Sequence, residues 1–160
     1  MGLPIPPGFI LTTECCNEVA REATELPPAR VRSYSKRLKE LEKQTGRIFT
    51  TQLAAGSSTL TMPLLFSVRS GSPVSMPGMM DTICYLGVND DNVDVMSKIT
   101  GNERFALDTH RRFIASYGEV VFGIDKLKYE EIVDSVKAQR GYLKDSELSA
   151  IDLKGIIIGK

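Results

Sequence analysis

The stretch LLFSVRSGSPVSMPGMMDTICYLGV, residues 64 to 88, holds two short apolar runs on which the fold class depends. The first run, LLFSVR, and the last, ICYLGV, have the length and composition of β-strands. Between them lies a loop of Ser, Gly, Pro and Met that carries no charge between Arg69 and Asp81. The sequence therefore predicts two strands that flank an uncharged loop.

Further elements are predicted before these strands. The apolar run from Gly8 to Leu11 suits another strand, and Thr12 and Thr13 are candidate N-caps for the helix that follows it. Apolar residues then recur at helical spacing from Val31 until Gly46, a residue type that commonly ends helices. The segment that follows is rich in Ser and Thr and is predicted to be a surface loop.

The chain after the strands is predicted to be helical. Asn89 precedes two aspartates and marks a helix start, Gly123 is placed to end a long helix, and Asp145 or Ser146 is a candidate cap for the last one. The long helix is expected to present one apolar face made of Phe105, Thr109, Phe113, Tyr117, Val120 and Val121.

The chain has the length of about one globular domain, 160 residues with 42% apolar and 25% charged side chains. Strands in the first half and helices in the second predict an α+β fold, with a sheet-containing part over residues 1–88 and a helical part over residues 89–160. Twenty basic residues balance twenty acidic ones, which disfavours nucleic-acid and anionic-membrane binding. No apolar run approaches the roughly 20 residues of a membrane-spanning helix. Three cysteines and the single His110 fit neither a disulfide framework nor a transition-metal site.

The arginine before the uncharged loop has the chemistry of an anion site. Arg69 ends an apolar strand and offers five donors in a fixed fork, a geometry that suits phosphate oxygens, and Ser70 adds a hydroxyl. Gly71 and Gly78 allow backbone N–H groups to approach an anion. The alternative is that Arg69 forms a salt bridge at a sheet edge and that the loop is an ordinary connection. Neither common nucleotide fingerprint, GxxxxGK(S/T) or GxGxxG, is present.

Three blocks of the sequence together resemble the nucleotide-binding domain of the pyruvate, phosphate dikinase family. They occur in the same order as in that family and read GLPIPPGFILTTE, FSVRSGSPVSMPGMMDTICYLGVND and TGNERFALDTHRRFIASYGEVVFGI. The resemblance is weakest over residues 20–62 and after about residue 125. It implies an ATP-grasp fold that binds ATP with Mg²⁺ between two lobes.

The resemblance also implies a reaction and a set of site residues. The family interconverts ATP, phosphate and pyruvate with AMP, diphosphate and phosphoenolpyruvate through a histidine on a separate domain. Arg69 matches the family arginine that contacts the nucleotide phosphates, and Arg112 matches a second arginine that faces the nucleotide. The loop beside the phosphates is matched by Ser70, Gly78, Met79, Met80, Asp81 and Thr82. His110 matches no phosphorylation motif of the family.

Other parts of the family's catalytic machinery are expected outside this chain. The resemblance places a Gly-Gly-Lys-Gly phosphate loop before Met1 and the acidic magnesium ligands after Lys160, so no metal ligand is predicted within the chain. We therefore expect a fragment that is inactive alone. Its full-length parent is expected to be a homo-oligomer that also binds pyruvate, phosphoenolpyruvate and phosphate, in the cytoplasm or, alternatively, in a plastid or glycosome.

Two other functions stay open at this point. A related phosphotransferase such as phosphoenolpyruvate synthase would share the Arg69–Ser70 pair, although its loop is expected to be more acidic. A non-catalytic interaction module would use the apolar faces of the helical half to bind a partner, with Arg69 in a structural role.

Overall fold

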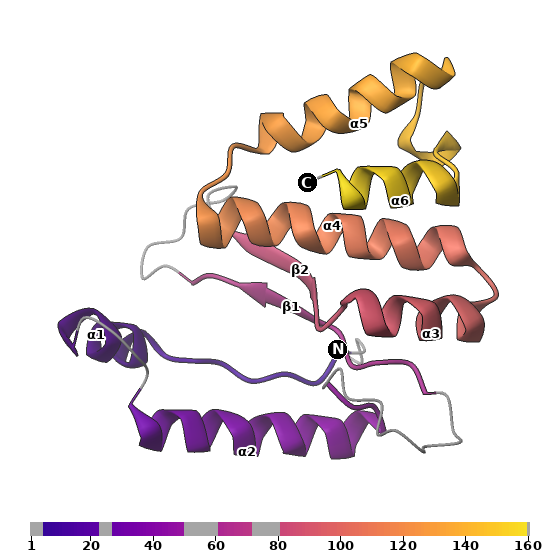
Figure 1. The fold of residues 1–160 in the computed structure, drawn as a ribbon. Coiled ribbons are helices and arrows are strands. Elements are labelled where there is room, and N and C mark those ends of the chain that lie inside the picture. Colours follow the sequence, from indigo (N-terminus) through magenta and orange to yellow (C-terminus); the bar gives the residue numbers. More distant parts are fainter. Residues whose placement is uncertain (1–4, 23–26, 50–60, 72–80, 160) are drawn as a thin grey trace. The chain divides into compact units, whose positions relative to one another are not determined.

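The computed structural model describes residues 5–22, 27–49, 61–71 and 81–159. The chain forms two compact units, Met1–Phe49 and Thr50–Lys160. The first unit contains the helices α1 (Thr13–Glu22) and α2 (Pro28–Thr45). The second contains β1 (Phe66–Arg69), β2 (Thr82–Leu86), α3 (Asp90–Thr100), α4 (Glu103–Phe122), α5 (Lys126–Arg140), the short 3-10 helix η1 (Asp145–Glu147) and α6 (Ala150–Ile158), as Figure 1 shows.

The first unit combines its two helices with an extended segment. α2 ends where Gly46 adopts a left-handed conformation with a φ of 66°, which glycine reaches without steric penalty. The ring of Phe9 in the extended segment meets Tyr34 of α2 edge to face, with 5.6 Å between centroids. The strand predicted from Gly8 to Leu11 is wrong, because this run has no pairing strand among the described residues and Ile10 is 88% exposed.

In the second unit, α4 is the central element. It packs against β2, α3 and α6, and α6 lies between α4 and α5 (Figure 1). The buried core of this unit consists of Val88, Val93, Met96, Ala106, Leu107, Val133, Leu148, Leu153 and Ile156. Burial of each large side chain stabilises the unit by about 1.5 to 3 kcal/mol relative to exposure. The core thus joins all the helices of this unit around α4.

The two strands pair antiparallel and form a hairpin. Arg69 lies opposite Thr82, at the end of the hairpin where the predicted loop leaves and returns. The register shifts between Phe66 and Val68, so that one residue of β1 faces two residues of β2. Tyr85, in this bulge, has a φ of 58°, a left-handed conformation that is uncommon for residues other than glycine.

Local signals in the sequence set most helix ends of the second unit. Asn89 caps α3 through a reciprocal capping box, and Gly123 ends α4 in a left-handed conformation, both as predicted. The predicted cap of the last helix is wrong, because Asp145 begins only the three-residue η1 and Ser149 caps α6. Ser149 has an aspartate three residues later that completes a capping box, whereas Asp145 has a leucine there.

The buried face of α4 agrees only in part with the predicted one. Thr109 is buried and Phe113 packs against the core, but Phe105 and Val121 are 45% and 50% exposed. Ala106 and Leu107, outside the predicted face, are buried. Because α4 contacts the sheet, α3 and α6 on different sides, a pattern with one apolar face does not describe it. Within the ranges that the structure describes, no helix has the length and apolar content needed to cross a membrane.

The mixture of helices and one small sheet agrees with the α+β prediction. The compact units divide between Phe49 and Thr50, whereas the sequence places the division near residue 88. The difference arises because β2 packs on α4, so the hairpin and the later helices share one unit. The assignment of these segments to lobes of an ATP-grasp domain stays a prediction.

Candidate functional site

The predicted site residues that the structure describes fall at two places in the second unit. Arg69, Ser70, Asp81 and Thr82 lie together at the end of the β1–β2 hairpin, and Arg112 lies on α4. Gly78, Met79 and Met80 lie outside the described residues.

At the hairpin end, backbone pairing continues one residue beyond the strands. The N–H of Ser70 donates to the carbonyl of Asp81 at 3.0 Å, and the Ser70 hydroxyl donates to the same carbonyl at 3.3 Å. These bonds hold the two ends of the segment between Ser70 and Asp81 together, next to the last residue of β1. The backbone on which Arg69 lies is therefore held in place by hydrogen bonds at the end of the hairpin.

Arg69 itself is exposed, and its guanidinium has no carboxylate partner in the part of the chain that the structure describes. Residues 72–80 contain no acidic side chain either. Its five N–H donors are thus not occupied by any described acceptor, and the salt bridge proposed as the alternative role of Arg69 is not seen among these residues. An unneutralised guanidinium in a fixed backbone position suits an anionic ligand such as phosphate.

Arg112 is held in a different way, within a charged cluster on α4. Its Nε donates to Oδ2 of Asp108, one helical turn earlier, at 2.8 Å, while its side chain is 54% exposed. The charge of Asp108 is the main cause that raises the pKa of Arg112 above its usual value. Partial burial opposes this rise in pKa, and the hydrogen bond to Asp108 and the groups of Tyr85 and Asp145 add to it. Arg112 therefore stays cationic at any ordinary pH.

Among the described residues, the two predicted arginines share no side-chain partner. Arg69 lies opposite Thr82 at the start of β2, whereas Arg112 is bound to Asp108 within α4. The structure thus provides two distinct points of positive charge along the hairpin and the helix that packs on it.

Sequence reasoning missed the charged cluster that surrounds Arg112. Asp108 also accepts two hydrogen bonds from Arg111, whose side chain is only 12% exposed and which reaches Asp145 at 3.5 Å. The signal that could have found this cluster is the spacing of Asp108 three and four residues before two arginines in a predicted helix.

Among residues 5–22, 27–49, 61–71 and 81–159, no three His, Cys, Asp or Glu side chains gather closely enough to hold a metal. The carboxylates near Arg112 form ion pairs with arginine and lysine side chains, as in the pairs of Asp108 with Arg111 and of Asp145 with Lys137.

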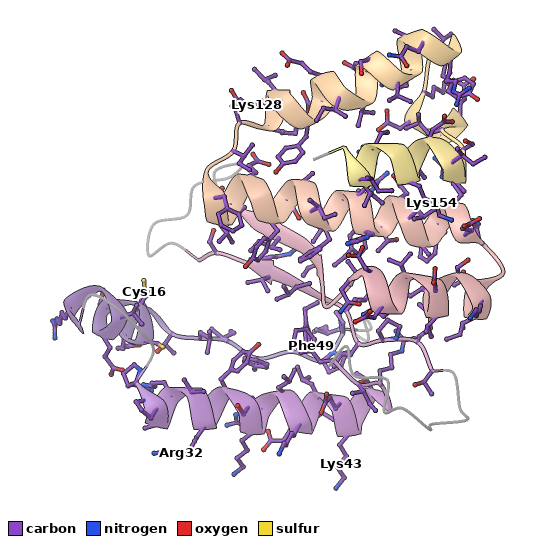
Figure 2. All side chains as sticks on the ribbon, viewed as in Figure 1. Cys16, Arg32, Lys43, Phe49, Lys128 and Lys154 are labelled. Atoms are coloured by element: carbon purple, nitrogen blue, oxygen red, sulfur yellow. The ribbon has the colours of Figure 1, made fainter. Side chains whose placement is uncertain are left out.

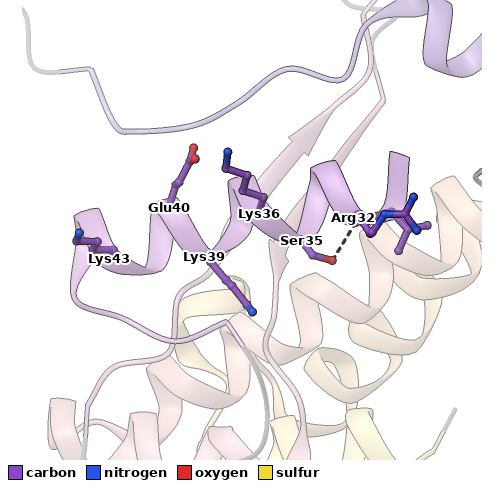
Figure 3. Close-up of a pocket in the computed structure, with 7 residues that line it drawn as sticks. Arg32, Ser35, Lys36, Lys39, Glu40 and Lys43 are labelled. Atoms are coloured by element: carbon purple, nitrogen blue, oxygen red, sulfur yellow. Dashed lines mark hydrogen bonds between the residues drawn. The ribbon is translucent and has the colours of Figure 1, made fainter. Parts of the chain in front are cut away.

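A surface groove lies along α2 in the first unit (Figure 3). It is lined by Val31, Arg32, Ser35, Lys36, Lys39, Glu40 and Lys43. Figure 2 shows Arg32 and Lys43 extending into open space from this helix. None of the predicted nucleotide contacts lines the groove, so it is not the predicted site.

Comparison with known proteins gives one consistent result. No family model matches the chain. The chain is 40% identical over 154 residues to the pyruvate, phosphate dikinase of Entamoeba histolytica, a match that covers 96% of this chain and 16% of that protein. It is 42% identical over 154 residues to the pyruvate, phosphate dikinase of Clostridium symbiosum, with 96% of this chain and 17% of that protein covered.

A chloroplastic relative shows the same pattern. The pyruvate, phosphate dikinase of Flaveria trinervia is 38% identical over 157 residues, which make up 98% of this chain and 16% of that protein. The chain thus spans about one sixth of the length of the curated relatives it matches. Because these matches cover nearly the whole chain, they include both the hairpin and α4, and the resemblance predicted from three blocks of sequence is confirmed.

Proposed function

We propose that this chain, which is homologous over nearly its whole length to a segment of pyruvate, phosphate dikinases, is part of the ATP-binding region of such an enzyme. The complete enzyme interconverts ATP, phosphate and pyruvate with AMP, diphosphate and phosphoenolpyruvate through a phosphohistidine on a separate domain. The chain alone is inactive. An ATP-grasp fold, Mg²⁺ bound with ATP by ligands outside the chain, a homo-oligomeric parent and a cytoplasmic location belong to the same proposal.

The observation that carries this proposal is the exposed position of Arg69 at the end of β1. This exposed arginine is the last residue of a hydrogen-bonded strand, has no carboxylate partner among the described residues, and precedes Ser70 with its hydroxyl. A preorganised guanidinium stabilises the charge that spreads over the oxygens of a transferring phosphoryl group. We assign Arg69 to the phosphates of ATP as a catalytic residue, with Ser70 beside it.

The remaining loop residues complete the proposed phosphate site. The bonds from Ser70 to Asp81 keep both ends of the loop next to Arg69, and Thr82 pairs with Arg69 across the hairpin. Gly78, Met79 and Met80 belong to the proposed site through their match to the family motif, and Arg112 is proposed as a second contact. The names of the relatives favour a dikinase over phosphoenolpyruvate synthase, and no observation favours a non-catalytic module.

The test replaces Arg69 in the full-length polypeptide in which we propose that the chain lies. Arg69→Ala is expected to lose about 2 to 4 kcal/mol of transition-state stabilisation in the phosphorylation of the enzyme's histidine by ATP, the range for a single preorganised donor. Arg69→Lys keeps the charge but loses the bidentate geometry, so it is expected to retain part of the rate.

Two controls make this test specific. Phosphoryl exchange between phosphoenolpyruvate and pyruvate does not use the nucleotide site and is expected to stay close to the wild-type rate in both variants. Arg32→Ala removes an exposed cation from α2 and is expected to leave both half-reactions unchanged. Histidine phosphorylation at the wild-type rate in Arg69→Ala would show that the assignment of Arg69 is wrong.

A further inference from the structure

We propose that Asp108 is a positioning residue that holds the guanidinium of Arg112 ready for the phosphates of the nucleotide, and that Arg111 anchors Asp108 for this purpose. The inference rests on the nucleotide role proposed above for Arg112. It adds two residues, Asp108 and Arg111, that neither the sequence motifs nor the resemblance singled out.

The carboxylate of Asp108 divides its two oxygens between neighbouring arginines. Its Oδ1 accepts from Nε of Arg111 at 3.0 Å and from Nη2 of Arg111 at 2.8 Å. Its Oδ2 accepts from Nε of Arg112 at 2.8 Å. The Asp108 side chain is 15% exposed, so this carboxylate is held mainly by protein groups and not by water.

The two arginines use this carboxylate differently. Arg111 is 12% exposed, presents the edge of its guanidinium to Asp108, and also reaches Asp145 at 3.5 Å. Arg112 is 54% exposed and is bound to Asp108 through Nε alone. Among the described residues, nothing accepts a hydrogen bond from either Nη of Arg112. The two Nη groups of Arg112 can therefore donate to phosphate oxygens, while its Nε is held by Asp108.

This arrangement lowers the cost of binding an anion. An arginine side chain that is free to rotate loses rotamer entropy when it is ordered, and a side chain that is already held by its Nε loses less when a ligand binds. Asp108 would repel phosphate if its charge were unbalanced, but Arg111 neutralises it. Asp108, Arg111 and Arg112 together carry one net positive charge, and the exposed part of that charge is the Nη end of Arg112.

The test is a double-mutant cycle in the full-length polypeptide, with Asp108→Asn, Arg112→Ala and both together. Asparagine has one acceptor oxygen where aspartate has two, and Arg111 makes two of the three hydrogen bonds, so Arg112 is the partner that loses its acceptor. Asp108→Asn is expected to lower kcat/KM for ATP in histidine phosphorylation roughly tenfold, in line with other losses of alignment. In the Arg112→Ala background, the same change is expected to have no further effect on this step.

Stability and a second carboxylate provide the controls. Asp108→Asn is expected to lower the midpoint of thermal unfolding in both backgrounds, because it removes the carboxylate charge that pairs with Arg111 in each of them. Asp145→Asn also removes a partner of Arg111 but no hydrogen bond of Arg112, and it is expected to change kcat/KM for ATP less than twofold. Exchange between phosphoenolpyruvate and pyruvate does not use the nucleotide site and is expected to stay close to the wild-type rate in each variant.

The outcomes separate this inference from the proposed function. An equal loss of kcat/KM from Asp108→Asn with and without Arg112 would show that Asp108 acts through the fold, and no loss in either background would also overturn the positioning role. If Arg112→Ala itself leaves kcat/KM for ATP unchanged, Arg112 has no role at the nucleotide. The proposal that Asp108 positions Arg112 for the nucleotide is then wrong as well. The role of Arg69 is tested separately and does not depend on this result.

Discussion

The end of the hairpin and the charged cluster on α4 each present an arginine to solvent, but they hold it in opposite ways. Arg69 is fixed only through the backbone of β1, and its guanidinium has no carboxylate partner among the described residues. Arg112 is fixed through its side chain, by a carboxylate one turn away. A guanidinium can thus keep N–H groups available to an anion in two ways. It can have no carboxylate partner at all, or it can bind a carboxylate through Nε alone.

The difference follows from the geometry of the two elements. In an antiparallel pair, the nearest side chain to a residue is the one opposite, and the residue opposite Arg69 is the uncharged Thr82. On a helix, the nearest side chains are three and four positions away, and Arg111 and Arg112 both find Asp108 there. The ion pairs of the cluster on α4 are therefore expected to contribute to stability, whereas Arg69 at the hairpin end forms no ion pair among the described residues.

The largest expected effect tests this difference in stability. Arg111→Ala removes two charge-assisted hydrogen bonds from Asp108, whose carboxylate is 15% exposed, and is expected to lower the free energy of unfolding by about 2 to 3 kcal/mol. Arg69→Ala breaks no ion pair among the described residues and is expected to change it by less than about 0.5 kcal/mol. Urea denaturation of the two variants measures both values, and equal losses would contradict the comparison.

The parts of the fold that were predicted correctly are those with local causes. Asn89 and Gly123 set helix ends because a cap depends on the few residues around it. The strand expected at Gly8–Leu11 is wrong because a strand depends on a partner that the local sequence does not reveal.

The candidate site was predictable to a similar extent. Arg69 was singled out because an arginine between an apolar strand and an uncharged loop is conspicuous in the sequence. It lies at the hairpin end, and its role in binding stays a prediction. The distance between Arg69 and Arg112 depends on how the hairpin packs on α4, which residue types do not show. The pairing of Asp108 was readable from helical spacing, but its division between Arg111 and Arg112 required coordinates.

A second prediction concerns the contact that joins the hairpin to the helix. The backbone N–H of Cys84 in β2 donates to Oγ of Ser116 in α4 at 3.1 Å. Ser116→Ala leaves that partly buried N–H without its acceptor and is expected to lower the free energy of unfolding by about 1 to 2 kcal/mol. Ser135→Ala is the matched control, because the Ser135 hydroxyl is exposed and bonds only within its own helix. Urea denaturation would contradict this prediction if both variants lost the same amount.

The smallest expected effect depends on pH and concerns Asp145, at the edge of the cluster. The hydrogen bond from Lys137 is the main cause that lowers the pKa of Asp145 below its usual value of 3.8. Partial burial opposes the shift, and the charges of Lys137, Arg111 and Arg112 support it. Because the folded-state pKa is lower than the unfolded one, the ionised carboxylate stabilises the folded state. This contribution is complete above the unfolded pKa and is lost as the pH falls through the folded one.

Asp145→Asn removes this contribution and so turns it into a measurable difference from the wild type. The Asp145 side chain is 43% exposed, so solvent screens its ion pairs, and the difference in the free energy of unfolding is expected to be about 0.5 kcal/mol at pH 7. It is expected to shrink as the pH falls from 7 towards 2, through the unfolded pKa and then the lower folded one, because the aspartate becomes protonated. Arg69→Ala breaks no described ion pair, so its small effect is expected to be the same at both pH values. If the difference in the free energy of unfolding between Asp145→Asn and the wild type persisted in acid, Asp145 would stabilise the cluster by packing and not by charge. The contrast between the hairpin end and α4 would then not be electrostatic at Asp145.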